Sequence, residues 1–372
     1  MLSYQPILVV TDSITRVDVR TATSDSTILI GNGLAGNLPA LLDEHRVGRR
    51  RFLVSSPTVW KHHGETVRAV SGDLEPILIP DGERYKTLAS VSKIYEALIR
   101  AGADRGSVLV CVGGGVIGDM GGFAAASFLR GITLVHVPTT LLAQVDSSIG
   151  GKVGVNHALG KNLIGAFHQP TLVAIDPLVL KTLRRREYRS GLYEVVKYGV
   201  IASRSLFDAL TTRTRAVFAQ DPDVVLPAII ESCRIKADVV SRDEREGGLR
   251  RILNYGHTVG HALEAVTHYR RFLHGEAIGY GMLAAADLAV RRGTMPETDR
   301  AALARLIQQL GKLPSVSDLS IPEVIAAVKR DKKVVDGTLH FVIATGIGTT
   351  ATIDDVTEAE LTEVLVGLGL PR

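Results

Sequence analysis

One stretch restricts the fold of this chain more than any other: residues 107–129, "SVLVCVGGGVIGDMGGFAAASFL". Its opening apolar run is short and rich in valine, as is typical of a buried strand. The glycines that follow allow a tight turn, and the small residues after them suit a helix. A strand, a glycine turn and a helix in this order predict an α/β sheet.

The turn within residues 110–119 offers a place for an anion, because backbone N–H groups and a helix N-terminus favour a phosphate there. The turn lacks the strict GxGxxG pattern of dinucleotide-binding turns, so a purely structural tight turn explains the glycines equally well. Asp119 does not suit a phosphate contact. Its carboxylate could cap the helix or meet a ribose or nicotinamide group.

The two halves of the chain differ in their hydrophobic pattern. In the first half, short β-branched runs alternate with helical stretches, which predicts a mostly parallel α/β sheet. From about residue 177 the pattern has helical periodicity, interrupted by one late strand at 338–348. Further strands are expected within 26–34, 50–60 and 132–145, and helices within 187–203, 223–243 and 257–269. We expect domains at 1–176 and 177–372, with a binding cleft between them.

Charge and composition exclude several classes of protein. The 43 basic and 39 acidic residues leave a formal charge of +4, and aromatic residues make up only 5%. Nucleic-acid binding would need a concentrated basic stripe and aromatic platforms, so a small anionic substrate is expected instead. No apolar run reaches the roughly 20 residues that span a bilayer, and residues 1–18 lack the pattern of a cleavable signal, so we expect a cytoplasmic protein without a membrane partner. Cys111 and Cys233 do not form a disulfide framework.

Residues 139–170 combine lysine, asparagine and glycine in an unusual way. Lys152 and Lys161 lie among glycines together with Asn156 and Asn162, between apolar flanks. Lysine supplies a compact charge for phosphate, and asparagine supplies donors and an acceptor for hydroxyl groups. We therefore expect a loop wrapped round an anion. The charged segment 80–88, "PDGERYKTL", is by itself explained as a solvated loop before a helix.

A histidine cluster follows in the second half. His257 and His261 are four residues apart and share one helix face, and His274 comes shortly after. Such a pair is a common half of a zinc site, but it also fits an ordinary polar helix face. The pattern alone does not distinguish a metal ligand from a catalytic base. The candidate carboxylates for a third ligand are Glu194, Glu246, Glu264 and Glu276.

Together these segments resemble the 3-dehydroquinate synthase family. The most specific matches are "DSSIGGKVGVN…GKN" and "LNYGHTVGHALE…HGEA", supported by "PDGERYKTL", "GLYEVVKYG" and "RDKK". The resemblance implies an N-terminal Rossmann-like α/β domain and a mainly α-helical C-terminal domain, with NAD and one divalent metal, zinc or cobalt, as cofactors. It implies conversion of 3-deoxy-D-arabino-heptulosonate 7-phosphate to 3-dehydroquinate and phosphate in the shikimate pathway, which leads to aromatic amino acids.

The resemblance also implies roles for individual residues. The implied metal ligands are Glu194, His257 and His274, with His261 as an acid/base or phosphate-side group. The implied NAD contacts are Asp81, Gly82, Glu83, Arg84, Tyr85, Lys86, Gly115, Val116, Ile117, Gly118, Asp119, Thr139, Thr140, Lys152, Lys161, Val179, Leu180, Lys181 and Thr182. The implied catalytic or substrate contacts are Asp146, Lys152, Asn162, Lys197, Lys236, Glu246, Arg250, Asn254 and Lys333. Arg130 is implied to reach a neighbouring subunit's site in a homodimer.

Two features depart from the family, and three other functions compete. Ser56 stands where many members carry an aspartate near the adenosine ribose, and about 15 leading residues lack a counterpart and are expected to form a loose extension. The rival enzymes are a sugar-phosphate cyclase of secondary metabolism and a metal-dependent NAD polyol dehydrogenase. The former tends to alter the two specific blocks, and the latter would not need Lys152, Lys161 and Asn162. A regulatory module without activity would be expected to lose one of the three metal ligands.

Overall fold

The computed structural model describes residues 14–332 and 340–372 and divides after Leu183 into two compact units. The division lies seven residues beyond the one expected at residue 176. A 3-10 helix, η6 (Pro177–Thr182), follows the last strand of the first unit and stays tied to it. The Asp176 carboxylate accepts hydrogen bonds from the backbone N–H groups of Leu178, Gly33 and Ala35 at 2.9–3.1 Å.

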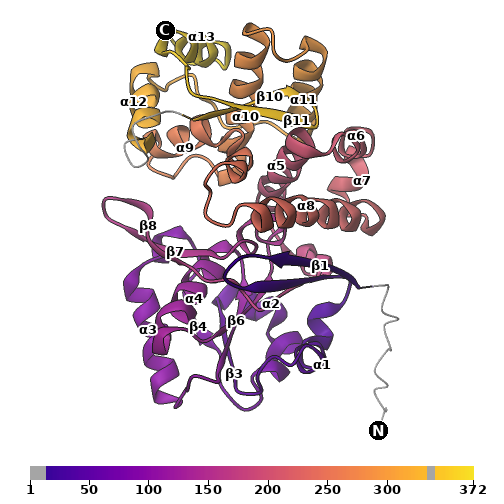
Figure 1. The fold of residues 1–372 in the computed structure, drawn as a ribbon, viewed down its shortest axis with the longest axis vertical. Coiled ribbons are helices and arrows are strands. Elements are labelled where there is room, and N and C mark those ends of the chain that lie inside the picture. Colours follow the sequence, from indigo (N-terminus) through magenta and orange to yellow (C-terminus); the bar gives the residue numbers. More distant parts are fainter. Residues whose placement is uncertain (1–13, 333–339) are drawn as a thin grey trace. The chain divides into compact units, whose positions relative to one another are not determined.

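A seven-stranded sheet forms the centre of the first unit (Figure 1), in the order β1-β2-β9-β6-β5-β3-β4. Every neighbouring pair is parallel except β1 and β2, which form an antiparallel edge. The strands are β1 (Thr15–Arg20), β2 (Asp25–Ile30), β3 (Arg51–Ser55), β4 (Ile77–Leu78), β5 (Val108–Gly113), β6 (Thr133–Pro138) and β9 (Leu172–Ile175). The predicted parallel sheet is confirmed.

Both faces of this sheet are buried, which explains its continuous apolar strands. Alternate residues of a strand point to opposite faces. Leu53, Val110 and Val112 face one core cluster, and Val54 and Leu109 face the other. The connecting helices are η1 (Leu34–Asn37), α1 (Leu38–Glu44), α2 (Pro57–Val67), η2 (Arg68–Val70), η3 (Glu83–Tyr85), α3 (Leu88–Arg100), α4 (Gly115–Ser127) and η4 (Phe128–Arg130).

The segment expected to be an anion-wrapping loop is largely regular structure. A π-helix, η5 (Ala143–Ser147), precedes a hairpin of β7 (Lys152–His157) and β8 (Gly160–Phe167) that packs on α4 (Figure 1). The glycines in this segment, which predicted a loop, belong to the paired strands. An ideal Cβ on Gly154 or Gly165 would lie 2.5 Å from a backbone oxygen of the facing strand, so these glycines permit close strand pairing.

The second unit is mainly helical, as predicted. Its centre is α10 (His274–Arg291), which packs against α5 (Arg185–Ala202) and α9 (His257–Val266). The late strand is β10 (Phe341–Gly346), but it pairs with an unpredicted β11 (Thr349–Ile353). The remaining helices are α6 (Arg204–Thr212), α7 (Thr214–Phe218), α8 (Pro222–Arg242), η7 (Leu249–Asn254), α11 (Glu297–Leu310), α12 (Ile321–Lys332) and α13 (Glu358–Gly367). Across the described ranges, no helix is both long and apolar enough to cross a membrane.

Candidate active site

The predicted NAD contacts of the first unit gather at one edge of its sheet. Residues 81–86 follow β4, 115–119 follow β5, 139–140 follow β6, and 179–182 follow β9. Because parallel strands end at the same edge, the fold brings these segments to one side. After β3, the chain places β4 on one side of this strand and β5 on the other. Ligands of such sheets bind at the carboxyl ends of the strands where the order reverses, here the ends of β3 and β5.

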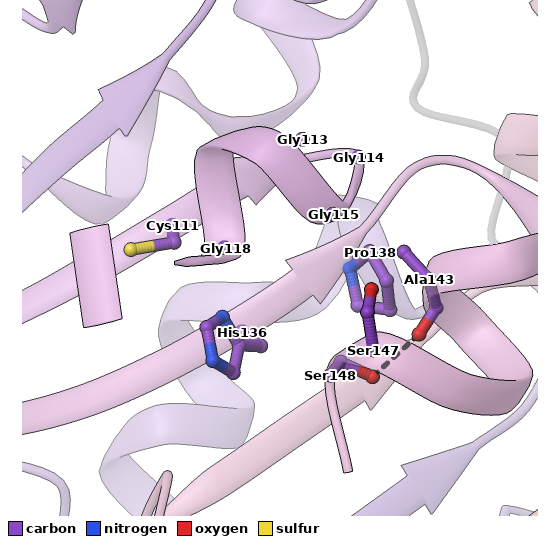
Figure 2. A pocket seen from close by; sticks show the side chains of 10 residues that line it. All are labelled: Cys111, Gly113, Gly114, Gly115, Gly118, His136, Pro138, Ala143, Ser147 and Ser148. Carbon is purple, nitrogen blue, oxygen red and sulfur yellow. Dashed lines mark hydrogen bonds between the residues drawn. The ribbon is translucent and has the colours of Figure 1, made fainter. Parts of the chain in front are cut away.

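The glycine turn after β5 leaves space that any side chain would fill. Gly114 precedes the first residue of α4, and an ideal Cβ on it would lie 2.9 Å from Thr140 Cγ2. A Cβ on Gly115 would lie 2.9 Å from Ser147 Oγ. Figure 2 shows the small cavity that results beside the N-terminus of α4. The cavity is lined by Cys111, Gly113, Gly114, Gly115, Gly118, His136, Pro138, Ala143, Ser147 and Ser148. The turn therefore fits a diphosphate, held by backbone N–H groups and the helix dipole.

A buried lysine organises the loop beside this turn. Lys86 Nζ donates to Asp119 Oδ2 and to Asn162 Oδ1, both at 2.5 Å. Burial raises the pKa of Asp119 to about 6, although the neighbouring Lys86 opposes the shift. Asn156 bonds Glu83 at 2.8 Å and accepts the Asn162 N–H at 3.0 Å. The two asparagines therefore fasten the hairpin to the 83–86 loop, a task that the sequence did not reveal.

Ser56 is the N-cap of α2. Its hydroxyl accepts the Val59 N–H at 3.3 Å. Asp81 lies nearby, since its carboxylate accepts from the Thr58 N–H at 3.3 Å and the Thr58 hydroxyl at 2.8 Å. A carboxylate is thus present at this sheet edge, but it comes from the loop after β4.

In the second unit three helices bring the predicted metal ligands together. Glu194 of α5 is fully buried, and its Oε1 lies 3.8 Å from His257 Nε2 and 3.5 Å from His274 Nε2. His261 also belongs to the cluster, since ligand atoms of the three histidines lie within 4.8 Å of one another. Lys197 Nζ forms an ion pair with Glu194 Oε2. Two imidazoles and a carboxylate form a donor set that suits catalytic zinc, so these residues fit a divalent metal.

The four candidate carboxylates differ in their hydrogen-bond partners. Glu276 is bound by Arg186 at 2.7 and 2.8 Å and by Arg189 at 3.0 Å, and it also accepts the Leu273 N–H at 2.9 Å. Glu246 accepts from Asn254 Nδ2 at 2.6 Å. Glu264 accepts from His274 Nδ1 at 3.2 Å. The observed contacts therefore favour Glu194 as the carboxylate ligand.

The outer nitrogens of two histidines are held by acceptors. His274 Nδ1 donates to Glu264, and His257 Nδ1 donates to the Tyr255 carbonyl at 3.2 Å. These bonds leave Nε2 of each ring directed at Glu194, so that a bound metal would take the Nε2 lone pair, as in protein-bound zinc sites. Burial holds the pKa of His257 well below its usual value. Burial has the same tendency at His274, but hydrogen bonds with Glu194 and Glu264 outweigh it and raise the pKa to about 10.

Close backbone contacts fix the position of His274, a signal that the sequence analysis missed. A Cβ on Gly275 would lie 1.9 Å from the Ser190 carbonyl oxygen of α5, and one on Gly281 would lie 1.7 Å from the Gly256 carbonyl oxygen. Glycine alone allows α10 to approach α5 and the start of α9 so closely. The glycines of "HGEAIGYG" were the available sign of this role.

The other predicted residues have varied surroundings. Lys197, Lys236 and Arg250 are buried cations of the second unit. In the first unit, Asp146 lies in η5, Lys152 begins β7 and Lys161 lies in β8. Arg130 has a positive φ of 70° at the end of η4. Lys333 lies outside the described residues.

Comparison with known proteins finds matches to one family. Family models described as 3-dehydroquinate synthase N-terminal and C-terminal match residues 76–190 and 191–334. The 3-dehydroquinate synthase of Nostoc sp. (strain PCC 7120 / SAG 25.82 / UTEX 2576) is 49% identical over 90% of this chain and 92% of its own length.

Two solved structures share the fold over almost the whole chain. The 2-epi-5-epi-valiolone synthase of Streptomyces hygroscopicus subsp. jinggangensis 5008, with NAD+ and Zn2+ bound, is 30% identical with a TM-score of 0.86, covering 95% of this chain and 99% of that one. A 2-deoxy-scyllo-inosose synthase in complex with carbaglucose-6-phosphate, NAD+ and Co2+ is 28% identical with a TM-score of 0.84, covering 94% and 99%. The matches to both domain models and the identity to the Nostoc enzyme show that the chain belongs to the 3-dehydroquinate synthase family.

Proposed function

We propose that this enzyme converts 3-deoxy-D-arabino-heptulosonate 7-phosphate to 3-dehydroquinate and phosphate. The observation that carries the proposal is the Glu194 carboxylate facing Nε2 of both His257 and His274, in a chain 49% identical to a 3-dehydroquinate synthase. The reaction belongs to the shikimate pathway and supplies aromatic amino acid biosynthesis. Its cofactors are NAD and one divalent metal, zinc or cobalt.

The two units would bind different cofactors. The turn after β5 and the segments at the same sheet edge would hold NAD, while Glu194, His257 and His274 would hold the metal. When bound, NAD and the metal supply a transient oxidation of one substrate alcohol and the polarisation of its oxygen. The substrate proton beside the oxidised carbon would then be acidic and would pass to His261 or to the departing phosphate, while phosphate leaves with the electron pair of its C–O bond. Ring opening and an intramolecular aldol step would complete the conversion, which is redox-neutral overall, so NAD would not be consumed.

The proposed work of the protein side chains is mainly binding and orientation. Lys152 and Asn162 contact the phosphate, and buried Lys197, Lys236 and Arg250 hold further anionic or hydroxyl groups. Fixed cations of this kind reduce the freedom of a charged substrate before elimination and ring closure. His261 moves a proton or lies on the phosphate side. Asp146, Glu246 and Asn254 complete the proposed substrate contacts, together with Lys333.

A sugar-phosphate cyclase of secondary metabolism is the second candidate, because the two solved relatives make other cyclic products. Identity favours the dehydroquinate reaction, at 49% to the Nostoc enzyme against 30% and 28% to these structures. Arg250 is 3% exposed, and its Nη1 is fixed by the Glu244 carbonyl. A rigid buried guanidinium suits a substrate carboxylate.

Product analysis tests the proposal. Purified protein is mixed with a divalent metal, the heptulosonate phosphate and NAD well below the substrate concentration. Phosphate and dehydroquinate should form in equal amounts over many turnovers, without accumulation of NADH. A polyol dehydrogenase would accumulate NADH with each substrate consumed and release no phosphate. Turnover only of a sugar phosphate that lacks the carboxylate would favour the second candidate.

We further propose a homodimer in the cytoplasm, in which Arg130 reaches the site of the neighbouring subunit. The backbone turns sharply here, with positive φ at Leu129, Arg130 and Gly131 in succession, and the Arg130 side chain is exposed, which supports the proposal. Co-refolding an Arg130→Ala chain with a His274→Ala chain tests the idea. Mixed dimers should recover activity that neither variant has alone. If confirmed mixed dimers remain inactive, Arg130 does not contribute to the neighbouring site. Cell fractionation would test whether the enzyme is cytoplasmic.

A further inference from the structure

The segment between α8 and η7 is organised by one carboxylate. Asp243 is the C-cap residue of α8. Its Oδ1 accepts the Gly247 N–H at 2.8 Å, and its Oδ2 accepts the N–H groups of Gly248 at 2.8 Å and Arg250 at 2.9 Å. Three convergent backbone donors resemble the pattern at an anion site, but the anion here is a side chain of the same loop.

This loop carries groups on which the proposed substrate contacts depend. Arg250 follows the loop as the second residue of η7, with its guanidinium fixed by the Glu244 carbonyl. Glu246 lies in its middle with a φ of +64°, a conformation that a residue with a side chain rarely adopts. Glu246 also accepts from Asn254 Nδ2 at 2.6 Å. Three of the proposed substrate residues therefore depend on one loop conformation.

The negative charge of Asp243 is stabilised by hydrogen bonds from its own loop. Burial tends to raise the pKa of this carboxyl, but the bonds from Arg250, Gly248 and Gly247 outweigh it and lower the pKa. The carboxylate therefore stays ionised at neutral pH and stabilises a strained backbone. Three backbone N–H groups bind its two oxygens, so the main contacts of the Asp243 carboxylate lie within its own loop.

We propose that Asp243 is a positioning residue that presets the Glu246–Arg250 loop to receive substrate. The proposal rests on the proposed function, because it assumes that Glu246, Arg250 and Asn254 contact the substrate. Asp243 acts through the backbone of Arg250 and the two glycines, and never touches the reacting molecule. Its loss leaves the metal and NAD sites intact but makes substrate binding less favourable.

The test compares Asp243→Ala with Asp243→Asn, using Asp238→Ala as a matched control. Asp238 lies on the same helix, 63% exposed, and bonds Arg242 at 3.2 Å. We expect Asp243→Ala to raise the KM for the heptulosonate phosphate at least about tenfold, with a smaller change in kcat, because misplaced binding groups weaken orientation. Asparagine keeps one acceptor oxygen and should recover part of the loss. The control should keep the KM of the unmodified enzyme.

A double variant sharpens the test. If Asp243 acts through Arg250 and its loop, adding Asp243→Ala to Arg250→Ala should change KM much less than it does alone. Loss of bound metal in a folded Asp243→Asn protein, or a fall in kcat with unchanged KM, would overturn the proposal. If the alanine variant does not fold, the same readouts in Asp243→Asn decide. An unmodified enzyme that makes no dehydroquinate would instead refute the proposed function, so the two failures are distinct.

Discussion

In the first unit the proposed NAD site consists largely of backbone at the ends of parallel strands, whereas the proposed metal site of the second unit consists of a buried carboxylate and two partly buried imidazoles from three helices. The glycine turn depends on the absence of side chains, since a Cβ on Gly114 or Gly115 would meet a neighbour at 2.9 Å. The metal cluster depends on side chains held by other side chains, such as His274 held by Glu264. Backbone sites follow from topology, but side-chain sites need specific supporting partners.

This contrast predicts that substitutions in the metal cluster have the largest effects. Glu194→Gln removes the proposed anionic ligand and should lower activity by roughly 10²–10³-fold, the range for losing one group that stabilises developing charge. Metal analysis should show reduced occupancy, while NAD binding to the first unit should be unchanged. His261→Ala is the comparison variant and should keep its metal. The opposite result, metal retained in Glu194→Gln and lost in His261→Ala, would overturn the proposed ligand set.

Supporting partners should matter next. Glu264→Ala leaves His274 Nδ1 without its carboxylate acceptor and should weaken metal binding by about 10–100-fold. Glu264→Gln keeps an acceptor oxygen and should recover much of the affinity. Competition with a chelator whose metal affinity is known gives the measurement. Equal affinity in the alanine variant and the unmodified enzyme would mean that Glu264 does not support the metal site.

The proposed NAD site should lose affinity when a side chain is added to its glycine turn. Gly114→Ala places a methyl group against Thr140 Cγ2 and should weaken NAD binding about tenfold, as expected for a close overlap. Thr140→Ser removes that methyl group and should restore binding in the double variant. Gly36→Ala is a suitable control, because a Cβ there meets nothing within 4 Å. Calorimetric titration with NAD would show whether the second substitution restores affinity, and no restoration would contradict the steric explanation.

The smallest expected effect concerns pH. Because burial raises the folded-state pKa of Asp119 to about 6, the folded protein binds more protons than the unfolded chain between about pH 4 and 6. The contribution of Asp119 to the free energy of unfolding should therefore fall as pH rises through this window. Denaturant unfolding of the unmodified enzyme and Asp119→Asn at several pH values measures the difference. A difference that stays constant from pH 4 to 7 would contradict the shifted pKa.

Sequence patterns predicted the proposed NAD site of the first unit better than the metal cluster of the second unit. The valine-rich run and the glycines after it specified a strand, a turn and a helix, and the parallel sheet then placed the NAD segments at one edge. The hairpin of β7 and β8 was missed because its glycines serve strand pairing, which depends on a partner segment. The structure divides later than expected because η6 is joined to a distant segment, with Thr182 Oγ1 2.8 Å from His63 Nε2.

For the metal cluster, spacing gave the candidates but not their roles. His257 and His261 share a helix face, but the sequence could not show that Glu276 is bound by two arginines or that Glu264 supports His274. These contacts depend on how α5, α9 and α10 pack together. The family resemblance supplied the choice of Glu194, and the contacts now give it a physical basis. Asp243 escaped notice because its three bonds go to backbone groups, whose positions the sequence does not display.

The proposed metal ligands are tested most directly by anomalous diffraction from crystals of the zinc-loaded enzyme, recorded on both sides of the zinc absorption edge. We expect one peak within about 2.0–2.2 Å of Glu194, His257 Nε2 and His274 Nε2, with His261 outside the coordination sphere. Glu264 and the Tyr255 carbonyl should still accept from the two Nδ1 atoms. A peak ligated by His257, His261 and His274, with Glu194 turned away, would contradict the central claim.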